Sequence, residues 1–162
     1  MERYLRTSLV ALVLLLLQTT IIQFLSLNGL LPDLLLIWVV YIAIRRGQVE
    51  AALSGFVVGC LQDVTTIQFF GLAALAKTVG GFAAGYFFNQ NRTEETLGTY
   101  RFALIILLAS FIHDMVYYAI FFQGIDVPFV TTTLRWSFFS ALYTGLVGLL
   151  PMFFYARKYA RM

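Results

Sequence analysis

The sequence predicts an all-α integral membrane protein, a bundle of six transmembrane helices, and three observations support this. The 162-residue chain is 60% hydrophobic and 12% charged, with a mean hydropathy of +0.85. A soluble domain is usually about 45–50% apolar and about 25% charged. The apolar residues form blocks of roughly membrane-spanning length, and the basic residues gather in the turns between alternate blocks. We therefore expect a single polytopic domain over residues 1–162.

The six spans follow from the apolar blocks. We expect them at about Tyr4–Leu25, Leu30–Ile44, Val49–Val64, Phe69–Phe88, Phe102–Phe122 and Val130–Tyr155. The second and third are short, about 23 Å at 1.5 Å per residue, against a hydrocarbon core of about 30 Å. Either their neighbours shield them or this hairpin is partly re-entrant. The charge pattern favours two true spans.

Basic residues in the turns predict the orientation. Nine of the eleven Lys and Arg residues fall on the side that carries both termini. These are Arg3, Arg6, Arg45, Arg46, Arg92, Arg101, Arg157, Lys158 and Arg161. Short cytoplasmic loops carry an excess of Lys and Arg. Both termini are therefore expected in the cytoplasm.

Counting depth along the spans predicts a buried polar layer in the outer half of the membrane. Its members are Gln18, Asp63, Lys77, His113, Asp114 and Arg135. The charges of its two acidic and two basic side chains sum to zero. We expect Asp63 to pair with Lys77. Charged residues within spans mark functional sites by default. The layer has two interpretations, a self-satisfied ion-pair network that fixes the packing and an outward-facing cavity for a small ligand or a partner.

The sequence offers no constellation for catalysis, a cofactor or a metal. His113 precedes Asp114, but a metal site needs several further ligands and the chain has no second histidine. No nucleophile–base pair, phosphate-binding loop or dinucleotide fingerprint occurs, and the basic residues form no patch for nucleic acid. We therefore expect no enzyme activity.

Small residues four apart mark candidate packing faces. Gly55 and Gly59 form one G-x-x-x-G pair, Gly81 and Gly85 form another, and Gly145 extends the theme near the C-terminus. Such residues let helix backbones approach closely in lipid. We expect these faces either to pack within the bundle or to dock a partner helix.

An ordered set of motifs resembles the rod shape-determining MreD family. The motifs are P-D-L-L-L-I followed by Y-I-A-I-R-R-G, then G-F-V-V-G-C-L-Q-D, F-G-L-A-A-L-A-K and G-F-A-A-G, over roughly Pro32–Gly85. The match to the family pattern marks Asp33, Arg46 and Gly71 as further positions of interest. The length and the six-span plan also resemble the family.

The resemblance implies a non-enzymatic scaffold of the cell-elongation complex in the bacterial inner membrane. Its expected direct partner is MreC, through a membrane helix, with RodA, its paired transpeptidase and MreB reached indirectly, and with membrane lipid around it. The family is also similar in fold to substrate-capture subunits of energy-coupling-factor transporters. The alternative function is therefore a vitamin-type capture subunit with an outer pocket at Asp63, Lys77, Asp114 and Arg135.

Overall fold

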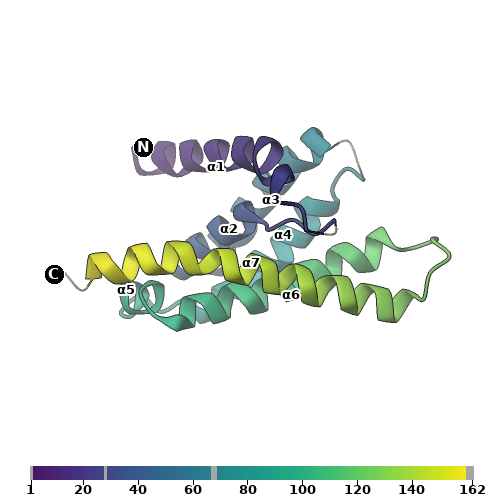
Figure 1. The fold of residues 1–162 in the computed structure, drawn as a ribbon. Coiled ribbons are helices and arrows are strands. Elements are labelled where there is room, and N and C mark those ends of the chain that lie inside the picture. The colour runs from purple at the N-terminus through teal and green to yellow at the C-terminus, as the bar shows by residue number, and fades with distance from the viewer. Residues whose placement is uncertain (1, 28, 67–68, 160–162) are drawn as a thin grey trace.

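The computed structural model describes residues 2–27, 29–66 and 69–159, which are almost entirely helical (Figure 1). The elements are α1 (Glu2–Thr20), the 3-10 turn η1 (Ile22–Leu25), α2 (Leu34–Arg46), α3 (Gln48–Thr66), α4 (Leu72–Ala84), the 3-10 turn η2 (Gly85–Phe87), α5 (Thr93–Leu97), α6 (Tyr100–Phe121) and α7 (Phe129–Tyr159). No β-strand occurs within these ranges. The all-α prediction is confirmed.

The long helices coincide with the expected spans and run back and forth between two ends of the molecule (Figure 1). The start of α1 and the end of α7 lie at one end, together with α5, and the α6–α7 connection lies at the other. Two segments, Tyr100–Phe121 and Phe129–Arg157, are long and apolar enough to cross a membrane. Thr7–Thr20 and Leu72–Phe87 are shorter apolar helices. Six crossings remain a prediction.

The short helix α2 is the centre of the bundle. The Asp33 side chain caps its N-terminus by accepting a hydrogen bond from the Leu36 N–H at 2.9 Å. Gly47 ends it with a φ of +90°, a left-handed conformation that favours glycine. Nine of its 13 residues are buried, which is typical of a helix that is apolar all round. Neighbouring helices therefore shield the short helix α2.

Two details of the helix prediction were wrong. Helix α3 has 19 residues and continues to Thr66, so the third span is not short. The polar loop before α6 contains the helix α5, which the sequence analysis missed. Its buried residues, Thr96 and Leu97, hold this segment against the bundle although most of its sequence is polar.

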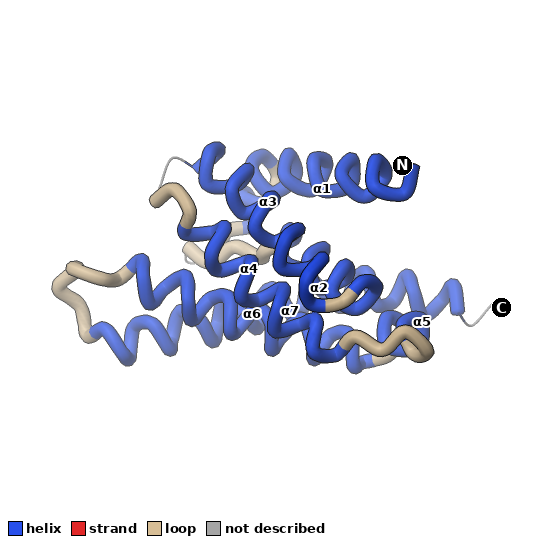
Figure 2. The backbone as a smooth tube through the Cα atoms, turned by 180° about the vertical axis from the view of Figure 1, so that it is seen from behind, coloured by secondary structure: helices blue, strands red, loops and turns tan. Residues whose placement is uncertain are grey.

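Helices α3 and α4 form the closest contact in the bundle, and α4 in turn packs on α6, which pairs with α7 (Figure 2). A Cβ atom at Gly55 would lie 2.5 Å from the Lys77 carbonyl oxygen, and one at Gly59 would lie 2.3 Å from the Ala74 Cα. Real Cβ atoms do not approach so closely. The two backbones therefore meet only because these residues are glycines.

The second glycine pair faces the same contact from the other helix. A Cβ at Gly81 would lie 2.9 Å from the Ala51 carbonyl oxygen, and one at Gly85 would lie 2.4 Å from the Gln48 Cα. Gly145 on α7 faces Leu107 of α6, whose Cδ1 would lie 3.0 Å from an added Cβ. These faces are filled by the chain's own helices. The alternative that they dock a partner helix is wrong for this reason.

Candidate functional site

Five of the six predicted members of the polar layer are buried. Gln18, Asp63, Lys77, His113 and Asp114 are each less than one tenth exposed. Arg135 is exposed, and its inclusion in the layer was wrong. The buried polar face of α7 carries Thr133, Ser137, Ser140 and Thr144. Because a helix turns 100° per residue, a side chain two positions from Thr133 points away from that face.

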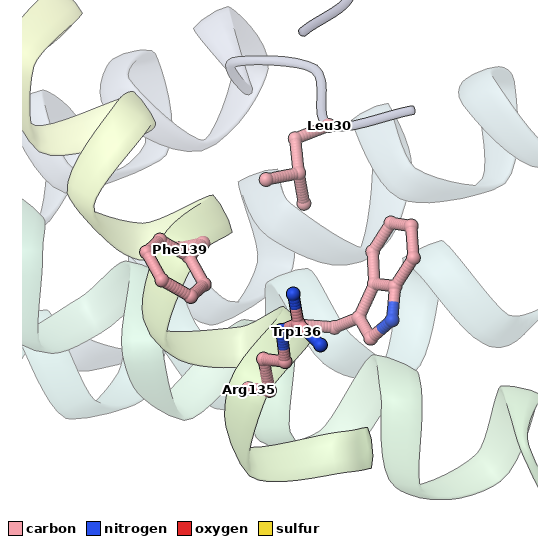
Figure 3. A pocket seen from close by; sticks show the side chains of 4 residues that line it. All are labelled: Leu30, Arg135, Trp136 and Phe139. Carbon is pink, nitrogen blue, oxygen red and sulfur yellow. The ribbon is translucent and has the colours of Figure 1, made fainter. Parts of the chain in front are cut away.

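Arg135 lies instead in a separate shallow pocket at the surface of α7. Figure 3 shows it beside Trp136 and Phe139 of the same helix, with Leu30 facing them from the segment before α2. This pocket has a volume of about 310 Å³.

The predicted pairing of Asp63 with Lys77 was also wrong. The Lys77 ammonium, which is completely buried, forms its ion pair with Asp33 at the start of α2. Asp63 instead accepts hydrogen bonds from three backbone N–H groups, those of Gly71 at 2.9 Å, Ala73 at 3.0 Å and Ala74 at 3.1 Å. These N–H groups at the N-terminus of α4 have no carbonyl partner within the helix, and a carboxylate is favoured there.

The α3–α4 turn explains the exchange of partners. It brings Asp63 to the first residues of α4, whereas Lys77 lies more than one turn further along that helix. From there Lys77 reaches across to α2. Lys77 and Asp63 therefore each have partners, but from different elements than expected.

Asp33 is the member of the layer that the sequence analysis missed. The match to the family pattern marks Asp33, and the same depth count applies to it. Asp33 lies 12 residues before Arg45, or about 18 Å from the inner edge at 1.5 Å per residue, which is the level of Asp114. The short length of α2 was the signal that its N-terminus lies deep.

Other polar side chains of the layer hold the non-helical segment before α2. The Gln18 side chain donates to the Pro32 carbonyl and accepts from the Leu34 N–H, both at 3.0 Å. The Thr144 hydroxyl accepts from the Asp33 N–H at 3.1 Å. Buried backbone groups outside a helix need such partners, most of all in lipid. This part of the layer is structural.

His113 and Asp114 form a second buried pair beside the Lys77–Asp33 pair. The His113 Nδ1 lies 2.9 Å from Asp114 Oδ1, and its Nε2 lies 3.8 Å from Asp33 Oδ2. The other oxygen of Asp114 and the His113 Nε2 make no hydrogen bond. Both side chains, with Asp33 and Lys77, line a cavity of about 400 Å³. Within the described residues, no group of three or more His, Cys, Asp and Glu side chains is placed to hold a metal ion.

The other family positions have structural roles near the ends of helices. The Arg46 guanidinium contacts Glu50 and the Thr7 hydroxyl, each at 3.2 Å, and so joins α2 to α3 and α1. Gly71 precedes α4 with a φ of +95°. An L side chain there would be strained, so this turn needs glycine to present its N–H to Asp63.

Two apolar grooves remain open on the sides of the bundle. The larger, about 850 Å³, lies between α1, α2 and α7 and runs from Thr7 to Leu17 on α1 and from Val147 to Tyr155 on α7. The smaller, about 520 Å³, lies along α6 and α7, and Leu108 and Leu142 are among its lining residues.

Comparison with known proteins gives one match. The family model described as rod shape-determining protein MreD matches residues 1–162, the whole chain. No curated protein and no solved structure matches. The family and the two long apolar helices together indicate a membrane protein that acts in rod shape determination.

Proposed function

Because the chain belongs to the rod shape-determining MreD family, we propose that it is a non-enzymatic, multi-pass protein of the bacterial inner membrane that acts as a scaffold of the cell-elongation complex. The family match over the whole chain carries this proposal. MreC is the direct partner, bound through its membrane helix. RodA, its paired transpeptidase and MreB are reached through that complex.

The arrangement of charge supports a multi-pass topology with both termini in the cytoplasm. Arg45 and Arg46 end α2, Arg92 immediately precedes α5, and Arg101 lies in the first turn of α6. Helix α5 lies at the end of the bundle where α1 begins and α7 ends (Figure 1). The α6–α7 connection at the opposite end carries no Lys or Arg over residues 122–128. This is the asymmetry expected of an inner-membrane protein.

The partner helix binds in the groove between α1, α2 and α7 in this proposal. The glycine faces are closed, so close packing must occur elsewhere. The groove follows α1 from Thr7 to Leu17, which is about 15 Å, or nearly three helical turns. Its lining is almost wholly apolar, as van der Waals packing between membrane helices requires. A lipid chain is the competing occupant.

The alternative of a transport capture subunit is less well supported. It needed one outer pocket lined by Asp63, Lys77, Asp114 and Arg135. The cavity includes Lys77 and Asp114, but Asp63 caps α4 and Arg135 lies in another pocket. The family match favours shape determination.

Purification from native membranes in a gentle detergent, followed by mass spectrometry, tests the proposal. We expect a stoichiometric single-span protein to accompany the chain, and cells depleted of the chain to lose their rod shape. Recovery of the chain with lipid alone, from cells that remain rod-shaped without it, would contradict the proposal.

A further inference from the structure

The cavity between α1, α3, α4, α6 and α7 is the most unusual feature that the scaffold role leaves unexplained. Its volume of about 400 Å³ is within the range of about 300–1,000 Å³ that is typical of small-molecule sites. Buried polar atoms normally have hydrogen-bond partners. Here two of them, Asp114 Oδ2 and His113 Nε2, have none, although both side chains are about 95% buried.

The unpaired atoms are acceptors. With its Nδ1 2.9 Å from the Asp114 carboxylate, the His113 ring donates from that nitrogen. When the ring carries its proton on Nδ1 alone, Nε2 is a lone-pair acceptor. Asp33 Oδ2, at 3.8 Å, is too far away to form a hydrogen bond with it. Gln62 Oε1, from α3, is a third unpaired atom among the residues that line the cavity.

The cavity also has an excess of negative charge. Among the described side chains that line it, Asp33 and Asp114 are carboxylates and Lys77 is the cation. Lys77 is paired with Asp33. Of the two carboxylates, Asp114 therefore has no Lys or Arg partner among these side chains, and an unpaired charge in a membrane interior is costly. Arg135 does not line this cavity and cannot neutralise it.

Aromatic rings form the remainder of the lining. Tyr117, Tyr118 and Phe121 come from α6, and Phe122 follows it. Trp136 of α7 lines both this cavity and the neighbouring pocket shown in Figure 3. Aromatic faces attract organic cations and accommodate their apolar parts.

We propose that this cavity binds a small organic cation, an ammonium group on an apolar body. The ammonium group donates to Asp114 Oδ2 and to the acceptors beside it, and the apolar body packs on the aromatic rings. Asp63, at a similar depth, takes no part, because three backbone N–H groups already satisfy it. This site does not depend on the scaffold role.

Equilibrium dialysis of the purified full chain with labelled benzylamine tests the proposal, with benzyl alcohol as the neutral probe of matched shape. We expect saturable binding of benzylamine near neutral pH and affinity for the alcohol that is at least about tenfold weaker, a loss of ~1.4 kcal/mol. Asp114→Asn should weaken benzylamine binding by about tenfold or more. Asp126→Asn, the same change at an exposed position of the α6–α7 connection, should leave it unchanged.

Circular dichroism verifies that each variant is folded. If Asp114→Asn does not fold, Gln62→Met decides, because Gln62 is only half-buried; it removes one acceptor and should weaken binding severalfold. Three results would overturn the proposal. They are no saturable binding of benzylamine to the unchanged chain, equal binding of the alcohol, and an equal loss with Asp126→Asn.

Discussion

The α3–α4 contact and the α1–α2–α7 groove are both apolar, yet they are opposite in character. At the first, four glycines bring two backbones together until no added Cβ would fit. At the second, larger side chains such as Leu14 and Leu150 stand apart and leave about 850 Å³ open. Small residues therefore mark where this bundle is closed. The surface that we propose for a partner lies where the side chains are large and the helices diverge.

The largest effect is expected from filling the closed contact. Gly59→Leu places a branched side chain where even a Cβ would lie 2.3 Å from the Ala74 Cα. Overpacking usually costs about 1–3 kcal/mol, and a clash with backbone exceeds that range. We expect almost no folded protein in detergent, measured by size-exclusion chromatography and thermal unfolding. Val57→Leu, on the exposed side of the same helix, should behave like the unchanged chain, and a normal yield of Gly59→Leu would refute the closed contact.

The next largest effect is expected from Lys77→Met, and a second substitution in that variant tests which carboxylate pairs with Lys77. Lys77→Met leaves Asp33, whose side chain is only 13% exposed, without its cation and should cost about 3–5 kcal/mol in free energy of unfolding. Asp33→Asn in the same chain should recover much of this loss, because the amide oxygen still caps α2. Asp63→Asn should give no recovery, since Asp63 binds backbone N–H groups. Thermal and denaturant unfolding measure the difference. Recovery by Asp63→Asn alone would show that Lys77 pairs with Asp63, as the sequence predicted, and not with Asp33.

A smaller effect on binding alone is expected in the open groove. Leu150→Trp fills part of it and should reduce the co-purified single-span partner by about tenfold, or ~1.4 kcal/mol, with the unfolding temperature unchanged. Leu108→Trp is the control, the same change at an exposed leucine in the groove along α6 and α7. Equal losses from both variants would show that the groove is not the specific docking surface.

The smallest effect is expected at the end of the bundle that carries α5. The Arg45 guanidinium lies 2.7 Å from Glu94, but the two side chains are 37% and 52% exposed. Exposed ion pairs contribute about 0.2–1 kcal/mol. Glu94→Gln should therefore lower the free energy of unfolding by no more than this and should leave partner recovery unchanged. A loss as large as that of Lys77→Met would mean that α5 has a greater structural role than its five residues indicate.

Much of the fold was predictable because a helix in lipid must be apolar over its length and the basic residues gather in the loops between such helices. Apolar block length and loop charge located the six long helices to within a few residues, and the depth count placed five polar residues in the buried layer. The helix α5 was missed because its sequence, T-E-E-T-L, is polar, and only tertiary contacts show that Thr96 and Leu97 are buried.

The partners within the layer could not be predicted from depth. Depth says which charges share a level, but not where each lies around the bundle. The prediction that Arg135 belongs to the layer was wrong for this reason, because its position around α7 places it on the exposed side of the helix. Lys77 pairs with Asp33 because α2 begins deep in the bundle. Asp63 accepts hydrogen bonds from backbone N–H groups, which a count of charged side chains does not include. The cavity beside Asp114 depends on the same rotations.

Photocrosslinking in growing cells tests the central claim most directly. A benzoyl-phenylalanine would replace Val10 or Leu150 in the groove between α1, α2 and α7, and Val57 or Leu108 on other faces of the bundle. The account predicts a crosslink to a single-span membrane protein from the two groove positions and none from the other two. Crosslinks to lipid alone from the groove, or to the same protein from Val57 or Leu108, would contradict it.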